Sequence, residues 1–512
     1  MIRCNAWVNE CAKQAHWQRA LEGLAEAHRQ GLRPRAKDFG GLLAALKGRR
    51  LWRQALGVLA EMRRQEVQPI LKTYNASISA CEKGHAWMHS LSLFQEMQQS
   101  SVHADTITWN TLISAVGKGQ ECSQALSLLS ELQRRHFEPN ATTYNASITA
   151  CERVGHWTGA LGLLLEMQQS TCLPDVITCG ACIGACARAA EWERALKLLA
   201  DIGRRGLRPN AVACNGAISA CEKGEQWLRA LRLFAGMRES GPRPDLVSHN
   251  ALLSALEKGH QWAGALAVLA GLRRLRGLTP DTITYNASIS ACEKGQRWQM
   301  AVHLFAEMEQ MCLPPNVVTY SALISATSKG HHWVSALGLL GHMRQGSVEP
   351  DVVSYGAAIS ACGQGRCWEL VLGLLEGMSL QCVLPNLIAC NAALSACGRA
   401  HCWRQGLQLL ADMRMREVWP DLVSYDAAML SCLSSHQVGW ALELLEDMAE
   451  AGVPADAQLL GRLLAECEER RLPGREVQLL ESLGALLADV PSEPPEPPPG
   501  RPAAVAAAAM RL

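Results

Sequence analysis

The chain lacks long apolar runs, and its net charge is only +1. Charged residues, Gly or Pro recur throughout its 512 residues, so no stretch approaches the roughly 18 apolar residues of a membrane span. We therefore expect a protein that is not integral to a membrane. Its 49 Lys and Arg balance 48 Asp and Glu, which excludes a global basic field. Any nucleic-acid binding must depend on a local stripe of charge.

The chain does have a period of 35 residues. Thirteen consecutive repeats fill Met1 to Asp456, and only repeat 8 (246–281) carries an extra residue; the repeats begin at residues 1, 36, 71, 106, 141, 176, 211, 246, 282, 317, 352, 387 and 422. Such a period predicts a solenoid, in which each repeat buries its apolar face only against its neighbours. Almost nothing lies outside the array to form a catalytic domain, so we expect a protein that is not an enzyme.

Each repeat is predicted to form two helices. In repeat 3, Tyr74, Ile78 and Cys81 follow helical spacing up to Lys83-Gly84, where Gly suits a left-handed helix end. A second apolar stripe runs from Trp87 to Met97. Most repeats then close with Pro-Asp or Pro-Asn, which stops one helix and leads into the next.

The 21 cysteines and 15 tryptophans mostly follow the repeat. Cysteine recurs at position 11, where a small apolar side chain suits a close helix contact. Cys179, Cys182 and Cys186 lie on one predicted helix, and no second Cys or His pair follows nearby at zinc-site spacing. This favours a packing role for the three cysteines over a zinc site. So many thiols without paired spacing indicate a reducing compartment. Tryptophan recurs at position 17, where we expect packing rather than base stacking.

Repeats such as Val317 to Asp351, with a Val-Val-Thr-Tyr opening and a Pro-Asp close, resemble the pentatricopeptide repeat family. The resemblance covers residues 1–456, and the chain is similar to family members without a C-terminal catalytic domain. It implies an all-α fold, a right-handed α-solenoid superhelix of helical hairpins, that binds single-stranded RNA with one nucleotide per repeat. It also implies that position 2 wedges between bases, that position 5 and the last residue recognise a base, and that position 13 lies near phosphates.

Position 2 is Ile or Val in ten repeats, and a stiff β-branched side chain can hold a flat base, although packing at the helix start is the alternative. The wedge candidates are Ile107, Ile177, Val212, Val247, Ile283, Val318, Val353 and Ile388. Position 13 is basic in ten repeats, which predicts a stripe of phosphate contacts; the alternative is a solvated helix C-terminus that favours cations. The phosphate candidates are Lys83, Lys118, Arg153, Arg188, Lys223, Lys258, Lys294, Lys329 and Arg399.

Short amide, hydroxyl and carboxylate side chains at position 5 and at the last position can match the pairing edge of a base. The base-recognising pairs are Asn75 with Asp105, Asn110 with Asn140, Asn145 with Asp175, Asn215 with Asp245, Asn250 with Asp281, Asn286 with Asn316, Ser321 with Asp351, and Asn391 with Asp421. By the family's code they imply a mostly pyrimidine target, U-Y-U-N-U-U-Y-G-N-U from repeat 3 to repeat 12. Ordinary helix capping is the alternative for any single pair.

Some repeats depart from this pattern. Repeats 1, 2 and 13 lack a standard pair, and Lys37, Lys72 and Thr142 interrupt the wedge. The Gly-Asn pairs of repeats 6 and 11, Gly180 with Asn210 and Gly356 with Asn386, leave a base edge poorly recognised. We expect those nucleotides to be unspecified.

Beyond the array, residues 457–489 keep helical periodicity and are predicted to form a degenerate repeat that caps the C-terminal end. Residues 490–512 are rich in Pro and Ala, which predicts a disordered tail. The family works mostly in chloroplasts or mitochondria, yet Met1 already begins a repeat and no transit segment is visible. We expect that the sequence is N-terminally incomplete or that the protein is not imported, and the missing N-terminal cap favours the first explanation.

The sequence therefore predicts a non-catalytic protein that occupies a pyrimidine-rich RNA in mRNA processing, stabilisation or translation, alone or with separate processing or translation factors. A protein-binding helical-repeat scaffold is the alternative. No cofactor is expected.

Overall fold

The computed structural model describes residues 36–48, 51–170, 172–239, 241–275 and 277–469. All regular secondary structure in these ranges is helical and comprises 25 helices, α3 to α27. Every one is 13 residues long except α9, which has 14. None of the helices described is long and apolar enough to cross a membrane.

The helices alternate between the two halves of each repeat, in the register that the sequence predicts. The first helices are α3 (Ala36–Gly48), α5 (Leu71–Lys83), α7 (Thr106–Lys118), α9 (Ala141–Val154), α11 (Val176–Arg188), α13 (Ala211–Lys223), α15 (Leu246–Lys258), α17 (Thr282–Lys294), α19 (Val317–Lys329), α21 (Val352–Gln364), α23 (Leu387–Arg399), α25 (Leu422–Ser434) and α27 (Ala457–Glu469). The second helices are α4 (Trp52–Arg64), α6 (Trp87–Gln99), α8 (Cys122–Arg134), α10 (Trp157–Gln169), α12 (Trp192–Arg204), α14 (Trp227–Glu239), α16 (Trp262–Arg274), α18 (Trp298–Gln310), α20 (Trp333–Gln345), α22 (Trp368–Leu380), α24 (Trp403–Met415) and α26 (Val438–Glu450).

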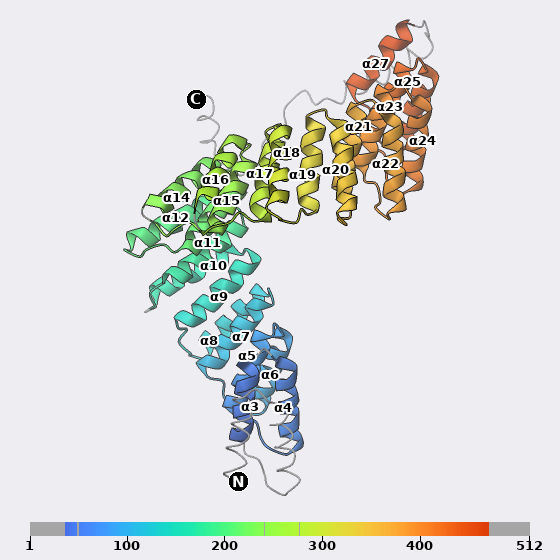
Figure 1. The fold of residues 1–512 in the computed structure, drawn as a ribbon. Coiled ribbons are helices and arrows are strands. Elements are labelled where there is room, and N and C mark those ends of the chain that lie inside the picture. The colour runs from blue at the N-terminus through green and yellow to red at the C-terminus, as the bar shows by residue number, and fades with distance from the viewer. Residues whose placement is uncertain (1–35, 49–50, 171, 240, 276, 470–512) are drawn as a thin grey trace, which may run out of the picture. The chain divides into compact units, whose positions relative to one another are not determined.

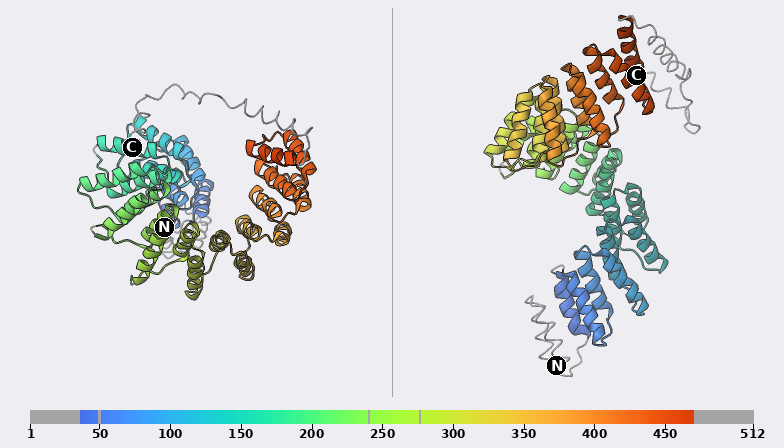
Figure 2. Two further views of the ribbon diagram at one scale, coloured as in Figure 1. Left: turned by 90° about the horizontal axis from the view of Figure 1, so that it is seen from above. Right: turned by 90° about the vertical axis from the view of Figure 1, so that its right-hand side faces the viewer.

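The chain divides within α17 into two compact parts, residues 1–291 and 292–512. In each part a first helix packs against the second helix of its own repeat and against neighbouring first helices, as α5 packs against α6 and α7, and α21 against α22 and α23 (Figure 1). Figure 2 shows this stacking of neighbouring hairpins within each part from two further directions. The fold is an α-solenoid, as predicted.

The core lies between the helices of adjacent hairpins. Tyr74, Ile78 and Cys81, the predicted apolar stripe of α5, are fully buried, and so is Met97 of α6. Burying one such side chain stabilises a fold by about 1.5–3 kcal/mol, so the stability of each repeat depends mainly on contacts with its neighbours.

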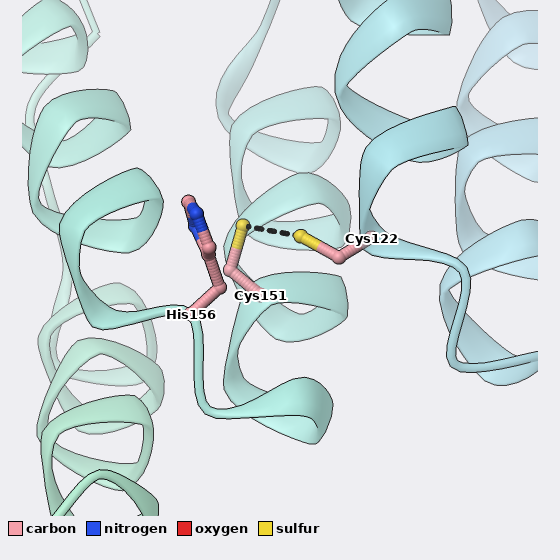
Figure 3. Close-up of side chains that lie close together, drawn as sticks. All are labelled: Cys122, Cys151 and His156. Atoms are coloured by element: carbon pink, nitrogen blue, oxygen red, sulfur yellow. Dashed lines mark hydrogen bonds between the residues drawn. The ribbon is translucent and has the colours of Figure 1, made fainter.

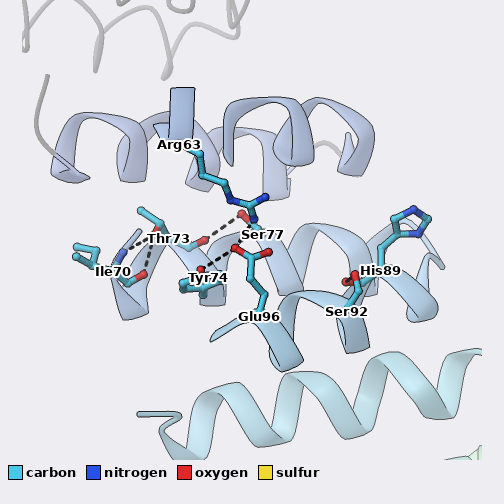
Figure 4. Close-up of polar contacts among 8 residues, drawn as sticks. All are labelled: Arg63, Ile70, Thr73, Tyr74, Ser77, His89, Ser92 and Glu96. Atoms are coloured by element: carbon cyan, nitrogen blue, oxygen red, sulfur yellow. Dashed lines mark hydrogen bonds and ion pairs between the residues drawn. The ribbon is translucent and has the colours of Figure 1, made fainter. Parts of the chain in front are cut away.

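A polar bridge joins repeats 2 and 3 on the side of the second helices (Figure 4). The Tyr74 hydroxyl donates to Glu96 over 2.9 Å, and Arg63 of the preceding repeat pairs with the same carboxylate. The same arrangement occurs in repeat 5, where Tyr144 donates to Glu166 over 3.2 Å and Gln133 of the preceding repeat also donates to Glu166. The Tyr at position 4 therefore combines a buried ring with a polar link.

The glycines that end the first helices correct one sequence-based interpretation. Gly84 has φ −87°, so it is not left-handed; the following residue, His85, has φ 58°. A Cβ at position 14 would instead lie 2.2–2.5 Å from the position-17 Trp ring of the preceding repeat, as for Gly84 with Trp52 and Gly224 with Trp192. Glycine at these positions leaves room for the indole ring. The prediction that these Trp residues serve packing is confirmed.

The cysteines at position 11 are buried, as predicted, in the repeats that the structure describes. Burial raises the pKa of the Cys81, Cys221 and Cys292 thiols to about 11, so they remain protonated and unreactive at neutral pH. Cys179, Cys182 and Cys186 are also buried on α11, which confirms a packing role for them.

Some predictions lie outside the described residues. They include all of repeat 1, with its Asn5 and Arg35 pair, and residues 470–512. Of the degenerate repeat, α27 is helical and begins at the position where a fourteenth repeat would start. Its role as a cap stays a prediction.

Candidate nucleic-acid interface

The position-2 side chains do not pack at the start of the helix. Ile107, Ile177, Val212, Val247, Ile283, Val318, Val353, Ile388 and Val423 are between 57 and 74 % exposed. Isolated exposed aliphatic residues are common, but here they recur at one position of successive first helices. The packing alternative is therefore excluded for these nine residues.

The last residue of a repeat caps the first helix of the next one. Oδ1 of Asp105 accepts the backbone N–H of Thr108 over 2.8 Å, and Oδ1 of Asn140 accepts that of Thr143 over 3.0 Å. The same bond, at 2.7–3.0 Å, starts α11, α13, α15, α17, α19, α21, α23 and α25. Such a cap contributes about 1 kcal/mol. The capping alternative is thus correct for these residues.

The position-5 side chain bonds the same cap. Asn75 Nδ2 donates to Asp105 Oδ1 over 3.1 Å, and the hydroxyl of Thr108 donates to Asn75 Oδ1 over 2.5 Å. Asn215 with Asp245 and Ser248, and Asn391 with Asp421 and Ser424, form the same triads. The structure therefore brings together position 5 and the last residue, and adds the position-3 hydroxyl, which sequence reasoning missed.

A signal for the position-3 hydroxyl was present in the sequence. Repeats 6 and 11 have Gly180 and Gly356 at position 5, and the following repeats have Ala213 and Ala389 at position 3 instead of Thr or Ser. Without an amide at position 5, the hydroxyl has no carbonyl to bond. The pattern is incomplete, because Gly40 of repeat 2 is followed by Thr73, whose hydroxyl bonds the carbonyl of Ile70 instead.

The cap uses only one oxygen of the carboxylate when the last residue of a repeat is Asp. In the described structure, Oδ2 of Asp105, Asp245 and Asp421 has no hydrogen-bond partner. Partial burial raises the pKa of these carboxyls, but hydrogen bonds from the position-3 residue and from Asn outweigh it, and the pKa lies below its usual value. Each carboxylate is therefore ionised and can only accept hydrogen bonds.

The basic residues at position 13 are less uniform than predicted. Lys118 pairs with Glu82 over 2.9 Å, Lys258 with Glu222 over 3.1 Å, and Lys329 with Glu293 over 2.8 Å. Each Glu stands at position 12 of the preceding repeat, so these pairs link neighbouring repeats and offset the charge of the stripe. Arg399 Nε instead donates to the Gly363 carbonyl over 3.0 Å.

The three predicted sets meet in one groove of the first part. A hollow of about 620 Å³ is lined by residues from position 2, from the base-recognising pairs and from position 13. They are Val212, Val247, Ile283, Asn215, Asn250, Asp281, Arg188 and Lys223. A smaller hollow of about 190 Å³ is lined by Lys118, Asn145 and Arg153. The first helices therefore line a groove that has apolar, amide and cationic walls.

One group of side chains in the described structure has donor atoms suited to a metal ion (Figure 3). The Sγ atoms of Cys122 and Cys151 are 3.2 Å apart, and a nitrogen of His156 lies within 4.8 Å of both. The group offers three ligands, one fewer than a closed structural zinc site, and His156 Nδ1 already accepts the N–H of Gly159 over 3.1 Å. Cys122 replaces the usual position-17 Trp, which places its thiol beside the position-11 Cys of the next repeat.

These hairpins and this groove define an α-helical repeat protein. Models of the PPR repeat family match residues 104–153, 280–329 and 315–364. The pentatricopeptide repeat domain matches residues 24–83 and 197–258, and the PPR repeat matches residues 142–172, 177–207 and 353–381. Together the matches cover more than half of the chain, which belongs to the pentatricopeptide repeat family.

Among solved structures, the chain is similar to the pentatricopeptide repeat protein PPR10 from maize, with 20 % identity, a TM-score of 0.51, and coverage of 95 % of this chain and 88 % of that one. PPR10 in complex with an 18-nt psaJ RNA element matches with 20 % identity and a TM-score of 0.52, over 96 % of this chain and 84 % of that one. At this identity the likeness shows the fold. The search of curated proteins returns no match.

Proposed function

We propose that the chain binds single-stranded RNA in the groove of its first helices, one nucleotide per repeat, and acts in organellar RNA metabolism. The observation that carries the proposal is the convergence of exposed aliphatic, amide and cationic side chains on one groove. A flat base fits between aliphatic side chains, amide and carboxylate groups suit its edge, and cations suit the phosphates. The similar protein PPR10 is described in complex with RNA.

The capping geometry supports a preference for uracil over cytosine. The ionised Oδ2 of Asp105, Asp245 or Asp421 accepts a hydrogen bond, which suits the N3–H of uracil and opposes the unprotonated N3 of cytosine. At repeat 4 the last residue is Asn140, whose Oδ1 is used by the cap, so its Nδ2 donates instead. We expect uracil opposite the Asn-Asp pairs, and cytosine to be accepted at repeat 4.

The chain would act by occupying its target: protecting it from nucleases, keeping it unfolded for translation, or positioning a separate processing factor. Chloroplast or mitochondrion is the proposed compartment, in accord with the family. The proposal includes no reaction on the RNA.

Filter binding with the strand U-Y-U-N-U-U-Y-G-N-U and with a purine-rich strand of equal length tests the proposal. We expect the predicted strand to bind more tightly, and replacing Lys223, Lys258, Lys294 and Lys329 together by Ala to weaken both complexes and flatten the salt dependence, by roughly 0.7 in the logarithmic slope per lost phosphate contact. Equal binding of both strands, with no effect of the four substitutions, would contradict RNA recognition. Capture of a peptide in the same groove would then favour the scaffold alternative.

A further inference from the structure

Repeat 6 differs from every other described repeat on the groove side of its first helix. Positions 5 and 9 are both glycine, Gly180 and Gly184 on α11, whereas position 9 is Thr149 in repeat 5 and Ser219 in repeat 7. Both glycines line the 620 Å³ hollow. The absence of two side chains on one helix face leaves space in the groove at this repeat.

The carboxylate of Glu152 lies in the space beside Gly184. A Cβ on Gly184 would lie 2.5 Å from Oε1 of Glu152, the position-12 residue of the preceding repeat. Glu152 also lines the hollow. Its carboxylate therefore occupies the place where the neighbouring repeats carry a hydroxyl side chain.

Glu152 lacks the partners of its counterparts. Glu82 accepts the hydroxyl of Ser114 over 2.8 Å and pairs with Lys118, and Glu293 likewise accepts from Ser325 over 2.7 Å and pairs with Lys329. Within the described residues, the carboxylate of Glu152 makes no hydrogen bond or ion pair. Burial raises the pKa of Glu152 above its usual value, and the charges of Arg188 and Arg153 offset this only in part. A half-buried acceptor without a partner is suited to a donor from a ligand.

We propose that Glu152 selects guanine at the nucleotide held by repeat 6, with the hollow over Gly180 and Gly184 accommodating the purine. This rests on the proposed function and replaces the expectation that the nucleotide is unspecified. A carboxylate can accept two hydrogen bonds side by side, and guanine presents two adjacent donors, N1–H and N2–H, on its pairing edge. Adenine, cytosine and uracil each present one kind of donor there. The hollow beside Gly180, which has no side chain, provides room for a purine.

Repeat 11 is a matched control within the chain. It has the same Gly-Asn pair, Gly356 with Asn386, and Asn386 caps α23 as Asn210 caps α13. Position 9, however, is Ser360, and position 12 of the preceding repeat is Ser328. Repeat 11 therefore has neither the second glycine nor the carboxylate, and we expect no preference for guanine there.

The test measures Kd for the predicted ten-nucleotide strand with each of the four bases at its fourth position (repeat 6) and, separately, at its ninth (repeat 11). We expect guanine at the fourth position to bind roughly tenfold more tightly than the other bases, and no preference at the ninth. Glu152→Gln should abolish the fourth-position preference. Gly184→Ser should also abolish it, because a serine would fill the hollow and donate to Glu152 as Ser114 does to Glu82. Both variants should still discriminate uracil at the fifth position.

Four equal Kd values at the fourth position, with uracil still preferred at the fifth, would overturn the inference and leave the proposed function standing. A guanine preference that persists in Glu152→Gln, or that also occurs at the ninth position, would show that Glu152 is not its source. Failure of the wild-type chain to bind any of these strands would refute the proposed function itself.

Discussion

Repeat 11 offers a way to test whether the triad of side chains determines base recognition. The change is Gly356→Asn together with Ala389→Ser, which copies the position-5 and position-3 residues of the Asn391, Asp421 and Ser424 triad. A side chain fits at position 356, because an added Cβ there meets no atom within 4 Å. Asn386 already caps α23 over 2.9 Å, so only the amide and the hydroxyl are missing.

The expected magnitude follows from the contacts that the new triad makes. In the comparable triad of repeat 4, Asn110 Nδ2 donates to Asn140 over 3.3 Å and Thr143 donates to Asn110 over 2.6 Å. A well-placed pair of polar contacts discriminates between bases by about 1–3 kcal/mol, so the ninth nucleotide should gain a preference for pyrimidines of roughly tenfold or more. Replacing Gly by Asn within a helix changes the free energy of unfolding by only a few tenths of a kcal/mol.

The assay is competition binding with the four variants of the ninth nucleotide, and thermal melting checks the fold. Gly356→Asn alone is the control, because without the hydroxyl at position 389 its amide is free to rotate, and we expect a weaker preference. If the double variant folds, still prefers uracil at the tenth nucleotide, and yet treats all bases alike at the ninth, then the triad does not determine recognition.

Four further experiments, three with substitutions and one with a thiol reagent, test other parts of the structure. Gly84→Ala should lower the free energy of unfolding by about 1–3 kcal/mol in denaturant melts because Trp52 occupies the space, whereas Gly356→Ala should stabilise or have no effect. Iodoacetamide at pH 7.5 should label the exposed Cys312 and Cys382 but not Cys81 or Cys221, as peptide mass spectrometry would show. The folded-state pKa values of four capping carboxyls are lowered from 3.8; they belong to Asp105, Asp245, Asp281 and Asp421. Their contribution to the free energy of unfolding should therefore be complete above pH 3.8 and be lost as the pH falls through the lower folded-state values. In melts from pH 5 to pH 2, the free energy of unfolding should decline less when all four residues are Asn. Glu222→Gln with Glu293→Gln should release Lys258 and Lys329 and tighten RNA binding at low salt, and an unchanged Kd would mean that these lysines do not contact the phosphates.

The helices could be predicted because the same pattern of residues recurs in successive repeats. Position 1 begins the first helix and position 17 the second in every repeat that the structure describes, as the recurring Trp and Pro-Asp indicate. Contacts between repeats were harder to predict. The role of Gly84 depends on Trp52, which lies 32 residues earlier in the chain. A rule for helix ends, which considers only nearby residues, therefore predicted a left-handed glycine where the structure shows a contact with an indole ring.

The same limit applies to the basic stripe and to the metal-like cysteines. Lys118 and Glu82 lie 36 residues apart, so their pairing follows from the stacking of two repeats and not from either repeat alone. Cys122 and Cys151 meet because one repeat has lost its Trp, whereas the conspicuous spacing of Cys179 and Cys182 only places both on a single buried helix. The spacing of residues within a repeat predicts which face of a helix they share. Contacts between residues one repeat apart can be predicted only when the packing of neighbouring repeats is known.

The sequence could not decide between capping and base recognition for the last residue because the two roles are not exclusive. The carboxylate of Asp421 has two oxygens: Oδ1 accepts from the Ser424 backbone and from Asn391, and Oδ2 has no partner among the residues that the structure describes. The bonds that stabilise the helix start also hold the side chain in one orientation and lower its pKa. An acceptor fixed in this way would lose little entropy on binding a base, so the cap is compatible with the proposed role of Oδ2 in recognition.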